Sequence, residues 1–480
     1  MLCHDEILNK DANFHFIAIG GVGQSALAKI LLQRGYSVSG SDVCDSKYLK
    51  ELKALGAKVF IGHNEENLPP ASNVVVSSAI KEDNPELKKA KNLKLNILHR
   101  SDILQILSSD FPVFIGFAGT HGKTTTSGLA SYLLTKIKAS PAYAVGGIIP
   151  GLNTNADASK DSTVFVAELD ESDGTISKYS PSILVINNLE ADHLDFYKNG
   201  LDDVLKTFKN LIASLSNDAK IVVNVDDTGV LTLLDKIADK NCLEKIVRFS
   251  AKSNLDKNGF VAKNINFNSN GAEFDVLQDD KTLGRAATSL KGLHNVYNVL
   301  AVIAALIEAG YDFNEFHPFV KDFSGMGRRF QTVFKNKDIE IIDDYAHHPS
   351  EIKATLKAAS DYKTKCGKKR IVAIFQPHRY TRLKALWNDF LNSFTDCDLL
   401  IVLDTFSAGD SFDEEYNSLN FVKNYKEANK DRNVCYTGGS IDETIAAVSS
   451  RIEINDIVLT LGAGDITKMG KLLGESYEGN

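Results

Sequence analysis

The sequence contains few cysteines, no long apolar run and no excess of positive charge. Its six cysteines are scattered through 480 residues and none forms a CxxC pair, so the sequence predicts neither a disulfide framework nor a zinc knuckle. No apolar run approaches the roughly 18 residues that a membrane-spanning helix requires. The formal net charge of −8 argues against a nucleic-acid-binding protein, because such proteins normally carry a broad basic surface.

The first residues and the overall composition are those of a soluble protein. Asp5, Glu6, Lys10 and Asp11 are charged, so the N-terminus lacks the apolar segment of a secretory signal. The chain is 43% hydrophobic and 24% charged, which is typical of globular proteins. We therefore expect a cytoplasmic protein with neither a nucleic-acid nor a membrane partner. At 480 residues the chain is too long for one hydrophobic core and should form about three domains.

Apolar, β-branched runs alternate with helical patterns along most of the chain, which is typical of α/β domains with mainly parallel sheets. The strands predicted in this way are residues 14–19, 38–40, 74–76, 113–117, 164–167, 183–186, 221–225, 339–342, 370–375, 399–403 and 457–461. Residues 250–290 alternate more like antiparallel strands, and a helix is predicted at 295–309. Polar or glycine-containing breaks near 108–112 and 323–327 predict domains at 1–109, 110–323 and 324–480.

A glycine-rich turn follows the first predicted strand. Residues 21–26 fit the G-x-G-x-x-A dinucleotide fingerprint, in which backbone N–H groups and a helix N-terminus bind a diphosphate. Asp42, at the end of the second strand, is placed to bind ribose hydroxyls. By itself the pattern also fits an NAD-dependent oxidoreductase, or a turn that only packs a helix on a sheet. The residues predicted to bind a nucleotide diphosphate are Gly20, Gly21, Val22, Gly23, Gln24 and Ser25.

A second phosphate-binding loop follows the strand at 113–117. Its sequence, GTHGKTTT, is a shorter form of the Walker pattern, because position 117 is Phe117 instead of glycine. In such loops backbone N–H groups cradle phosphate oxygens, the lysine reaches the β- and γ-phosphates, and the first threonine ligates magnesium. A dehydrogenase needs no second loop, whereas an enzyme that activates a nucleotide-linked substrate needs two nucleotide sites. The residues predicted to bind the triphosphate are Gly119, Thr120, His121, Gly122, Lys123, Thr124 and Thr125.

Two predicted strands of the middle region end in acidic loops, at 168–173 and 187–195. The carboxyl ends of strands border the ligand crevice in open α/β sheets, so both loops should face the phosphate loop. Carboxylate and phosphate oxygens are ligands that Mg²⁺ prefers. We therefore predict a magnesium site where these two acidic loops face the phosphate loop, with His193 as a further candidate. The alternative is a pair of solvated acidic loops, and a lone histidine is more often structural than a ligand.

The two loops and the acidic segments belong to a longer series of motifs through which the sequence resembles the Mur ligase family along essentially the whole chain. The motifs are HFIAIGGVGQSALA from His15, GSD from Gly40, VVVSSAI from Val74, NPE from Asn84, GTHGKTTT from Gly119, AELDESD from Ala167, NNLEADHLD from Asn187, GLHNVYN from Gly292, GMGRRFQ from Gly325, DDYAHHPSE from Asp343, FQPHRYTR from Phe375 and LGAGDI from Leu461. The resemblance implies a three-domain α/β fold. Its parts would be an N-terminal Rossmann-like domain that binds UDP, a central P-loop ATPase domain and a C-terminal Rossmann-like domain.

The resemblance also implies an activity and a set of site residues. The motifs are most similar to those of family members that use ATP and Mg²⁺ to join L-alanine to UDP-N-acetylmuramic acid. By this resemblance the catalytic residues are Lys123, His193 and Arg379, and the magnesium ligands are Thr124, Glu168 and His193. The implied ATP contacts beyond the loop are Asn295, Asn298, Arg329 and Asp344. The implied contacts to the muramyl nucleotide and alanine are Ser77, Ser78, His121, Tyr345, His347, Arg379 and Arg382.

Three other functions remain open at this point. The nearest is a recycling ligase that adds a ready-made tripeptide to the same muramyl nucleotide. An NAD-dependent oxidoreductase would use the first glycine loop but would leave GTHGKTTT unexplained. A catalytically silent nucleotide-binding scaffold would not need the intact metal and phosphate residues. For the ligase we expect a monomer or a homodimer.

Overall fold

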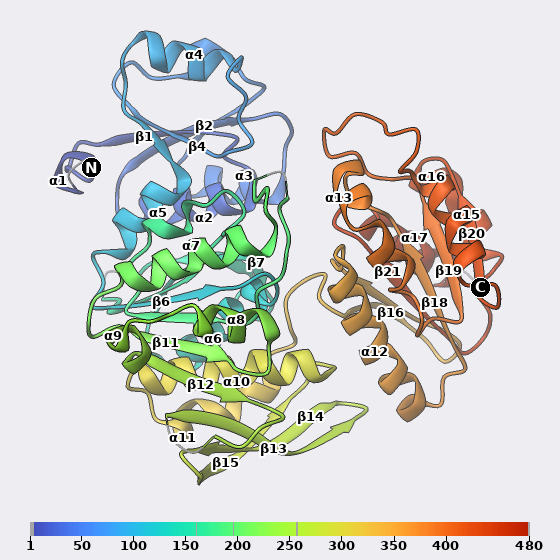
Figure 1. The fold of residues 1–480 in the computed structure, drawn as a ribbon. Helices are drawn as coiled ribbons and strands as arrows, with labels where there is room; N and C mark the ends of the chain where they lie inside the picture. Colours follow the sequence, from blue (N-terminus) through green and yellow to red (C-terminus); the bar gives the residue numbers. More distant parts are fainter. Residues whose placement is uncertain (1–3, 160, 195, 256–257, 479–480) are drawn as a thin grey trace. The chain divides into compact units, whose positions relative to one another are not determined.

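The computed structural model describes residues 4–159, 161–194, 196–255 and 258–478. The strands in these residues form three sheets, of five, ten and six strands, and helices pack against them (Figure 1). Most neighbouring strands are parallel, as the alternation of strand and helix patterns predicted. The mixed α/β class with mainly parallel sheets is therefore confirmed.

The N-terminal sheet has the order β3-β2-β1-β4-β5, and all its strand pairs are parallel. Phe14 and Phe16 of β1 belong to the core that contains α2, whereas Ile17 points to the other face and packs with α4. The predicted strand at 14–19 is too long, because Ala18 has a φ of 64° and ends the strand at Ile17. The strands are β1 (Asn13–Ile17), β2 (Ser37–Asp42), β3 (Lys58–Ile61), β4 (Asn73–Val76) and β5 (Ile97–His99).

The central sheet has the order β15-β14-β13-β12-β11-β10-β6-β9-β7-β8. Its middle strands, β12-β11-β10-β6-β9-β7, are parallel, and β8 is antiparallel to β7. The strands are β6 (Val113–Ala118), β7 (Ala142–Ile149), β8 (Thr154–Asp157), β9 (Val164–Glu168), β10 (Ile183–Ile186), β11 (Lys220–Asn224), β12 (Ile246–Ser250), β13 (Gly259–Asn268), β14 (Gly271–Gln278) and β15 (Lys281–Thr288).

The region predicted to be antiparallel contains β13, β14 and β15. Only two residues connect each of these strands to the next, and a connection that short joins antiparallel neighbours, because a parallel crossover needs a dozen or more residues. However, β13 pairs in parallel with β12, with Phe249 opposite Phe260. The antiparallel extension therefore continues the parallel sheet instead of forming a separate one.

The C-terminal sheet has the order β16-β17-β21-β18-β19-β20, and only its edge pair, β16 and β17, is antiparallel among the pairs described. Successive residues of a strand point to opposite faces. Accordingly, Ile371, Ala373 and Phe375 of β18 pack with α12 and α15, whereas Val372 and Ile374 pack with α16 and α17. The strands are β16 (Gln331–Lys335), β17 (Glu340–Asp344), β18 (Arg370–Phe375), β19 (Leu399–Leu403), β20 (Asn433–Thr437) and β21 (Asp456–Leu461).

Helices α2 and α6 begin directly after the two glycine-containing loops. The helix predicted at 295–309 is α10, which begins two residues earlier. The helices are α1 (His4–Ile7), α2 (Val22–Gln33), α3 (Lys47–Ala54), α4 (Pro85–Asn92), α5 (Arg100–Ser108), α6 (Lys123–Lys136), α7 (Leu201–Ser214), α8 (Thr228–Asp235), α9 (Lys240–Glu244), α10 (Leu293–Glu308), α11 (Phe313–Phe316), α12 (Pro349–Cys366), α13 (Tyr380–Ala385), α14 (Trp387–Leu391), α15 (Ser418–Ala428), α16 (Ile441–Ser449) and α17 (Thr467–Glu478).

The chain divides into two compact units. One comprises Met1–Val261, Leu277–Leu283 and Asn298–Val320, and the other comprises Ala262–Val276, Gly284–Tyr297 and Lys321–Asn480. Within the parts of the chain that the structure describes, none of the helices has the length and apolarity needed to cross a membrane. The described cysteines are all free thiols.

Within the first unit, α2 of the N-terminal sheet packs on β7 and β8 of the central sheet. The Asn155 amide donates to the Val22 carbonyl at 3.0 Å, and the Gln33 amide donates to Asp157 at 2.6 Å. The ammonium of Lys29 donates to the Thr154 hydroxyl at 2.5 Å. These contacts hold the first glycine loop, where α2 begins, against the central sheet.

Candidate functional site

The first glycine loop connects β1 to α2. The Gly20 N–H donates to the Asp42 carboxylate at 2.8 Å, so the acid at the end of β2 holds the turn closed. A Cβ atom at Gly20 would lie 2.8 Å from the same carboxylate, so a side chain there would push Asp42 away from the turn. The structure thus places Asp42 beside the loop, and its predicted contact with ribose stays a prediction.

The second loop, residues 119–122, connects β6 to α6, and glycine is required at both of its ends. Gly119 has a φ of 119° and Gly122 a φ of 87°, in the region that side chains rarely adopt. A Cβ atom at Gly122 would lie 2.5 Å from Asn298 Oδ1. Asn188 fixes the middle of the loop, because its carbonyl accepts from the Thr120 N–H at 3.0 Å and its side-chain oxygen accepts from the His121 N–H at 2.7 Å.

Lys123 is the first residue of α6, and its side chain is mostly buried. Its ammonium donates to the Gly119 carbonyl at 2.7 Å, the Thr120 carbonyl at 3.1 Å and Glu171 Oε1 at 3.0 Å. Burial alone would lower the pKa of Lys123, but the nearby carboxylates, Glu171 first among them, raise it above its usual value. Lys123 is therefore a charged ammonium directly after the loop at 119–122.

Thr124 and Glu168, two of the three predicted magnesium ligands, lie together. The Thr124 hydroxyl donates to Glu168 Oε2 at 2.9 Å, and the same oxygen accepts from the Gly146 N–H at 3.1 Å. Neighbouring parallel strands β6 and β9 bring the two residues to one edge of the sheet. His193 has a φ of 52°, its Nε2 lies 3.7 Å from Asp192 Oδ2, and its carbonyl accepts from the Phe196 and Tyr197 N–H groups at 2.9 Å. Asp195, in the same loop, lies outside the described residues.

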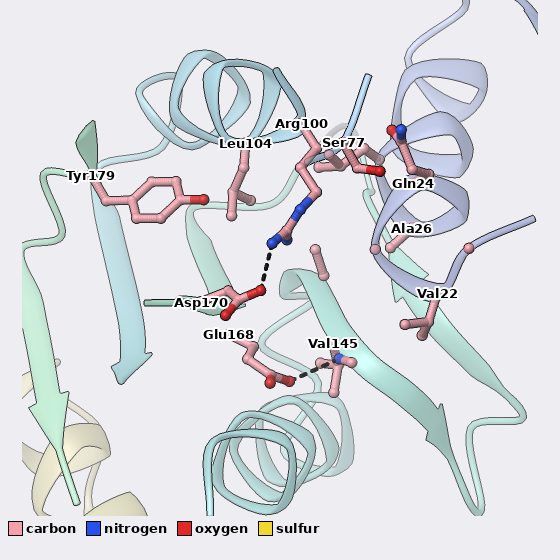
Figure 2. Close-up of a pocket in the computed structure, with 15 residues that line it drawn as sticks. Val22, Gln24, Ala26, Ser77, Arg100, Leu104, Val145, Glu168, Asp170 and Tyr179 are labelled. Carbon is pink, nitrogen blue, oxygen red and sulfur yellow. Dashed lines mark hydrogen bonds and ion pairs between the residues drawn. The ribbon is translucent and has the colours of Figure 1, made fainter. Parts of the chain in front are cut away.

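Arg100, which no sequence motif identified, forms the centre of a charged group between the two sheets of the first unit. Its guanidinium donates to Asp170 at 2.5 Å (Figure 2). It also lies 4.0 Å from Asp173. Although burial raises the pKa of Asp170, Arg100 and then Lys123 hold it well below its usual range. The Ser78 hydroxyl donates to the Asp173 carboxylate at 2.5 Å. Ser78, a predicted substrate residue, is thus hydrogen-bonded to this charged group.

A cavity of about 300 Å³ lies between the first glycine loop and these acidic residues. Figure 2 shows Arg100 and Asp170 on one side of it, Glu168 below them and α2 opposite. Predicted nucleotide and substrate residues therefore border one cavity together with the predicted magnesium ligand Glu168. The lining residues that the sequence analysis had singled out are Gly21, Val22, Gly23, Gln24, Ser77 and Glu168.

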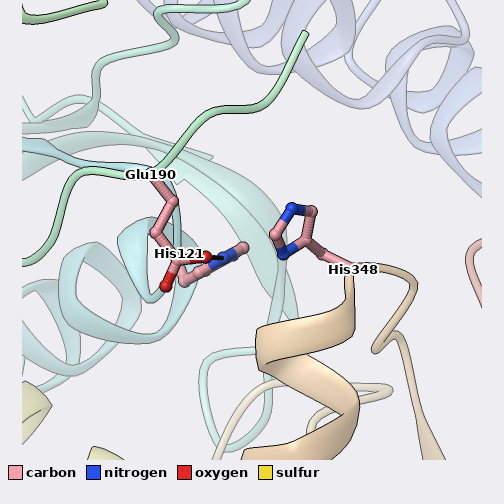
Figure 3. Close-up of side chains that lie close together, drawn as sticks. All are labelled: His121, Glu190 and His348. Carbon is pink, nitrogen blue, oxygen red and sulfur yellow. Dashed lines mark ion pairs between the residues drawn. The ribbon is translucent and has the colours of Figure 1, made fainter. Parts of the chain in front are cut away.

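His121 of the phosphate loop lies beside Glu190 from the loop after β10 (Figure 3). The distance from His121 Nε2 to Glu190 Oε2 is 3.5 Å, and the Glu190 N–H donates to the Thr120 hydroxyl at 2.9 Å. The second acidic loop thus faces the phosphate loop, as predicted from its place after a parallel strand. His348, which Figure 3 also labels, is the N-cap of α12 in the other compact unit.

Two residues predicted to contact ATP belong to the C-terminal sheet region: Asp344 ends β17, and Arg329 lies just before β16. Asp344, at the end of β17, is buried and accepts from the Phe330 N–H at 2.7 Å and the Ala346 N–H at 2.8 Å. Burial raises the pKa of Asp344 to about 6, although Arg329 opposes this shift. The Arg329 guanidinium lies over the Tyr345 ring, 5.0 Å from its centroid.

The predicted carboxylate-binding residues gather around His378, a residue to which the sequence alone assigns no role. Arg382 Nη1 lies 3.3 Å from His378 Nδ1, and since an arginine can only donate, this nitrogen is an acceptor and the ring is neutral. Burial, and then Arg382 and Arg379, lower the pKa of His378 to about 4. The His347 ring lies 6.0 Å from His378, and Arg379 Nε lies 3.5 Å from Asp410.

The predicted adenine contacts are at the start of α10. Asn298 is buried, and its side-chain oxygen is the group against which Gly122 packs. Asn295 is also buried and donates to the Lys291 carbonyl at 2.8 Å. Asn298 is therefore next to the phosphate loop, whereas the contact described for Asn295 is within its own helix start.

A glycine loop of the phosphate-binding type between β6 and α6, in the same compact unit as a second glycine loop between β1 and α2, is typical of nucleotide-binding proteins. Comparison with known proteins identifies the family. Three family models match in order along the chain. They are the Mur ligase family catalytic domain at residues 13–112, the Mur ligase middle domain at 117–306 and the Mur ligase glutamate ligase domain at 328–464. The chain belongs to the Mur ligase family, and like its other members it is an ATP-dependent ligase.

Individual relatives are similar over nearly the full length. A UDP-N-acetylmuramate–L-alanine ligase from Sulfurihydrogenibium sp. is 38% identical over 466 residues, which cover 97% of this chain and 98% of the relative. The crystal structure of a UDP-N-acetylmuramate-alanine ligase from Thermotoga maritima is 26% identical, with a TM-score of 0.79 and coverage of 97% and 99%. A murein peptide ligase from Psychrobacter arcticus, at 23% identity, shares the fold with a TM-score of 0.68 and coverage of 96% and 98%.

Proposed function

We propose that this ligase joins L-alanine to the lactyl carboxylate of UDP-N-acetylmuramic acid, giving UDP-N-acetylmuramoyl-L-alanine, ADP and phosphate in peptidoglycan synthesis. The observation that carries the proposal is the cavity shared by the first glycine loop and Glu168, beside the phosphate loop. A ligase with a nucleotide-linked substrate needs this arrangement of two adjoining nucleotide sites. The relatives named L-alanine ligases, at 34–38% identity, favour alanine over a tripeptide as the second substrate.

In the proposed reaction the muramyl carboxylate attacks the γ-phosphorus of ATP, so that ADP leaves and an acyl phosphate forms. The alanine amine then attacks the acyl carbon, and phosphate leaves from the tetrahedral intermediate as the amine loses its proton. Lys123 offsets charge on the transferring phosphoryl group, and the backbone N–H groups of residues 119–122 position it. The glycine loop at 20–23 and the start of α2 hold the UDP diphosphate. Arg379 and Arg382 bind carboxylate groups bidentately.

We propose that Thr124 and Glu168 hold Mg²⁺. Both offer oxygen ligands, which Mg²⁺ prefers, and they lie 2.9 Å apart at the loop that binds phosphate. When bound, the ion would offset negative charge on the triphosphate. The role of His193 rests on the family resemblance.

Replacing Glu168 by glutamine should weaken magnesium binding. Because the substitution removes an anionic ligand, we expect the Mg²⁺ concentration for half-maximal turnover to rise about 10–100-fold. Titration of the nucleotide-bound protein with Mn²⁺ by paramagnetic resonance should show the same loss without requiring turnover. The matched control is Glu273→Gln, which removes an exposed carboxylate that pairs with Arg285. An unchanged metal dependence in the Glu168 variant would exclude Glu168 as a ligand.

The second substrate is tested by phosphate release from purified protein with ATP, Mg²⁺ and UDP-N-acetylmuramic acid. We expect release to require L-alanine, and the product to have the mass of the alanyl nucleotide. Release with the tripeptide L-alanyl-D-glutamyl-diaminopimelate instead would show a recycling ligase. Absence of release with either would contradict the ligase assignment.

Three further properties are proposed on the same basis. The protein acts in the cytoplasm, where ATP and the muramyl nucleotide are present. It functions as a monomer or a homodimer, which light scattering would distinguish. Its domains divide at 109/110 and 323/324, as the composition breaks in the sequence predicted.

A further inference from the structure

The phosphate-loop lysine has no hydrogen left for a phosphate. An ammonium has three hydrogens, and Lys123 donates to three protein acceptors, the carbonyls of Gly119 and Thr120 and the carboxylate of Glu171. The side chain of Lys123 is 12% exposed and that of Glu171 only 3%. A triphosphate that uses this lysine must therefore displace at least one of these acceptors.

Glu171 is the charged acceptor of the three, and its backbone is fixed. Its carbonyl accepts from the Tyr197 hydroxyl at 2.6 Å and from the Gly174 N–H at 2.9 Å. Tyr197 is itself buried. Because these hydrogen bonds hold its backbone, Glu171 stays in place when Lys123 moves toward a phosphate.

The other carboxylates of the same loop face different partners. Asp170 pairs with Arg100, and Glu168 accepts from Thr124. Glu171 Oε2 has no hydrogen-bond partner among the described residues. Burial raises the pKa of Glu171 to about 7, and Lys123 opposes this shift. The charged form of Glu171 therefore depends on Lys123.

We propose that Glu171 is a positioning residue that holds Lys123 on its own loop and competes with the β- and γ-phosphates of ATP for its ammonium. The inference rests on the proposed function in that Lys123 binds the triphosphate. Glu171 holds the lysine on its own loop before the nucleotide arrives, and part of the binding energy of the triphosphate is used to draw the lysine away from it. ATP thus binds less tightly than the loop alone would allow.

The test is the affinity of Glu171→Gln for a non-hydrolysable ATP analogue with Mg²⁺, measured by calorimetry. The glutamine keeps an oxygen acceptor but loses the charge, so the lysine is released more easily. Since hydrogen bonds between charged groups are worth more than neutral ones, we expect about tenfold tighter binding. The KM for ATP should fall while kcat does not rise. A merely structural role cannot produce a gain in affinity, and unchanged or weaker binding would overturn the proposal.

Further variants keep the test decisive. In a Lys123→Ala background, Glu171→Gln should leave the affinity unchanged, because the competition needs the lysine. Asp202→Asn is the matched control, since it removes an exposed carboxylate that pairs with Lys236 at 2.9 Å, and its affinity should equal wild type. If Glu171→Gln does not fold, Glu171→Asp, which shortens the reach to Lys123, should bind more tightly than wild type. Failure of the wild type to bind the analogue would instead overturn the proposed function.

Discussion

Lys123→Ala is expected to lower kcat for ATP-dependent ligation by about 10³-fold. The ammonium lies at the phosphate loop and is charged, because nearby carboxylates raise its pKa. It offsets charge that develops on the transferring phosphoryl group, which no neutral side chain can do. The measurement is single-turnover phosphoryl transfer with ATP, Mg²⁺ and UDP-N-acetylmuramic acid. Turnover near the wild-type rate would contradict the role of Lys123 in the reaction.

The fold should survive Lys123→Ala, because Glu171 can lose its charge by taking up a proton when its cationic partner is removed. Lys123 lowers the pKa of Glu171, which burial raises to about 7. Without the lysine this pKa rises further, so Glu171 takes up a proton at neutral pH and is buried as a neutral group. The difference in unfolding free energy between the variant and the wild type should therefore favour the variant more below about pH 7 than above it. Thermal unfolding between pH 6 and 8 checks this, with Lys136→Ala, an exposed lysine at the end of the same helix, as control.

The parts of the fold that the sequence predicted well are strands with continuous apolar runs. Residues 183–186, 370–375 and 399–403 were predicted as strands and correspond residue for residue to β10, β18 and β19. Buried strands of a parallel sheet are apolar on both faces, so their ends are marked by the first polar residue or turn. The strand at 14–19 was predicted too long, because nothing in the residue type of Ala18 indicates its positive φ.

The candidate site was predictable where residues follow neighbouring strands. Thr124 and Glu168 were expected together because each follows a parallel strand, and β6 and β9 are indeed adjacent. The sequence alone assigns no role to Arg100 or Glu171, although Glu171 lies within the AELDESD motif. Their contacts depend on how α5 and the loop after β9 pack. No local pattern encodes such distances, and only the packed structure reveals them.

Gly122→Ala is expected to reduce the affinity for ATP and to lower the rate of ligation by about 100-fold, because a displacement of about 1 Å at a reacting group can cost that much in rate. Gly122 has a φ of 87°, where an alanine costs about 1–2 kcal/mol. In addition, its Cβ atom would lie 2.5 Å from Asn298 Oδ1 and 3.0 Å from Asn187 Nδ2. Either the loop, just before Lys123, or the Asn298 side chain that packs against it must therefore shift.

A matched variant separates the steric effect from the backbone strain. Gly310 has a similar φ of 92°, but a Cβ atom there would meet nothing within 4 Å. Gly310→Ala should therefore lose about 1–2 kcal/mol of unfolding free energy and keep its affinity for ATP. Calorimetric titration with the non-hydrolysable analogue and chemical denaturation of both variants give the comparison. Equal affinity in the two variants would show that the phosphate loop tolerates a side chain at Gly122, and that its contact with Asn298 does not shape the nucleotide site.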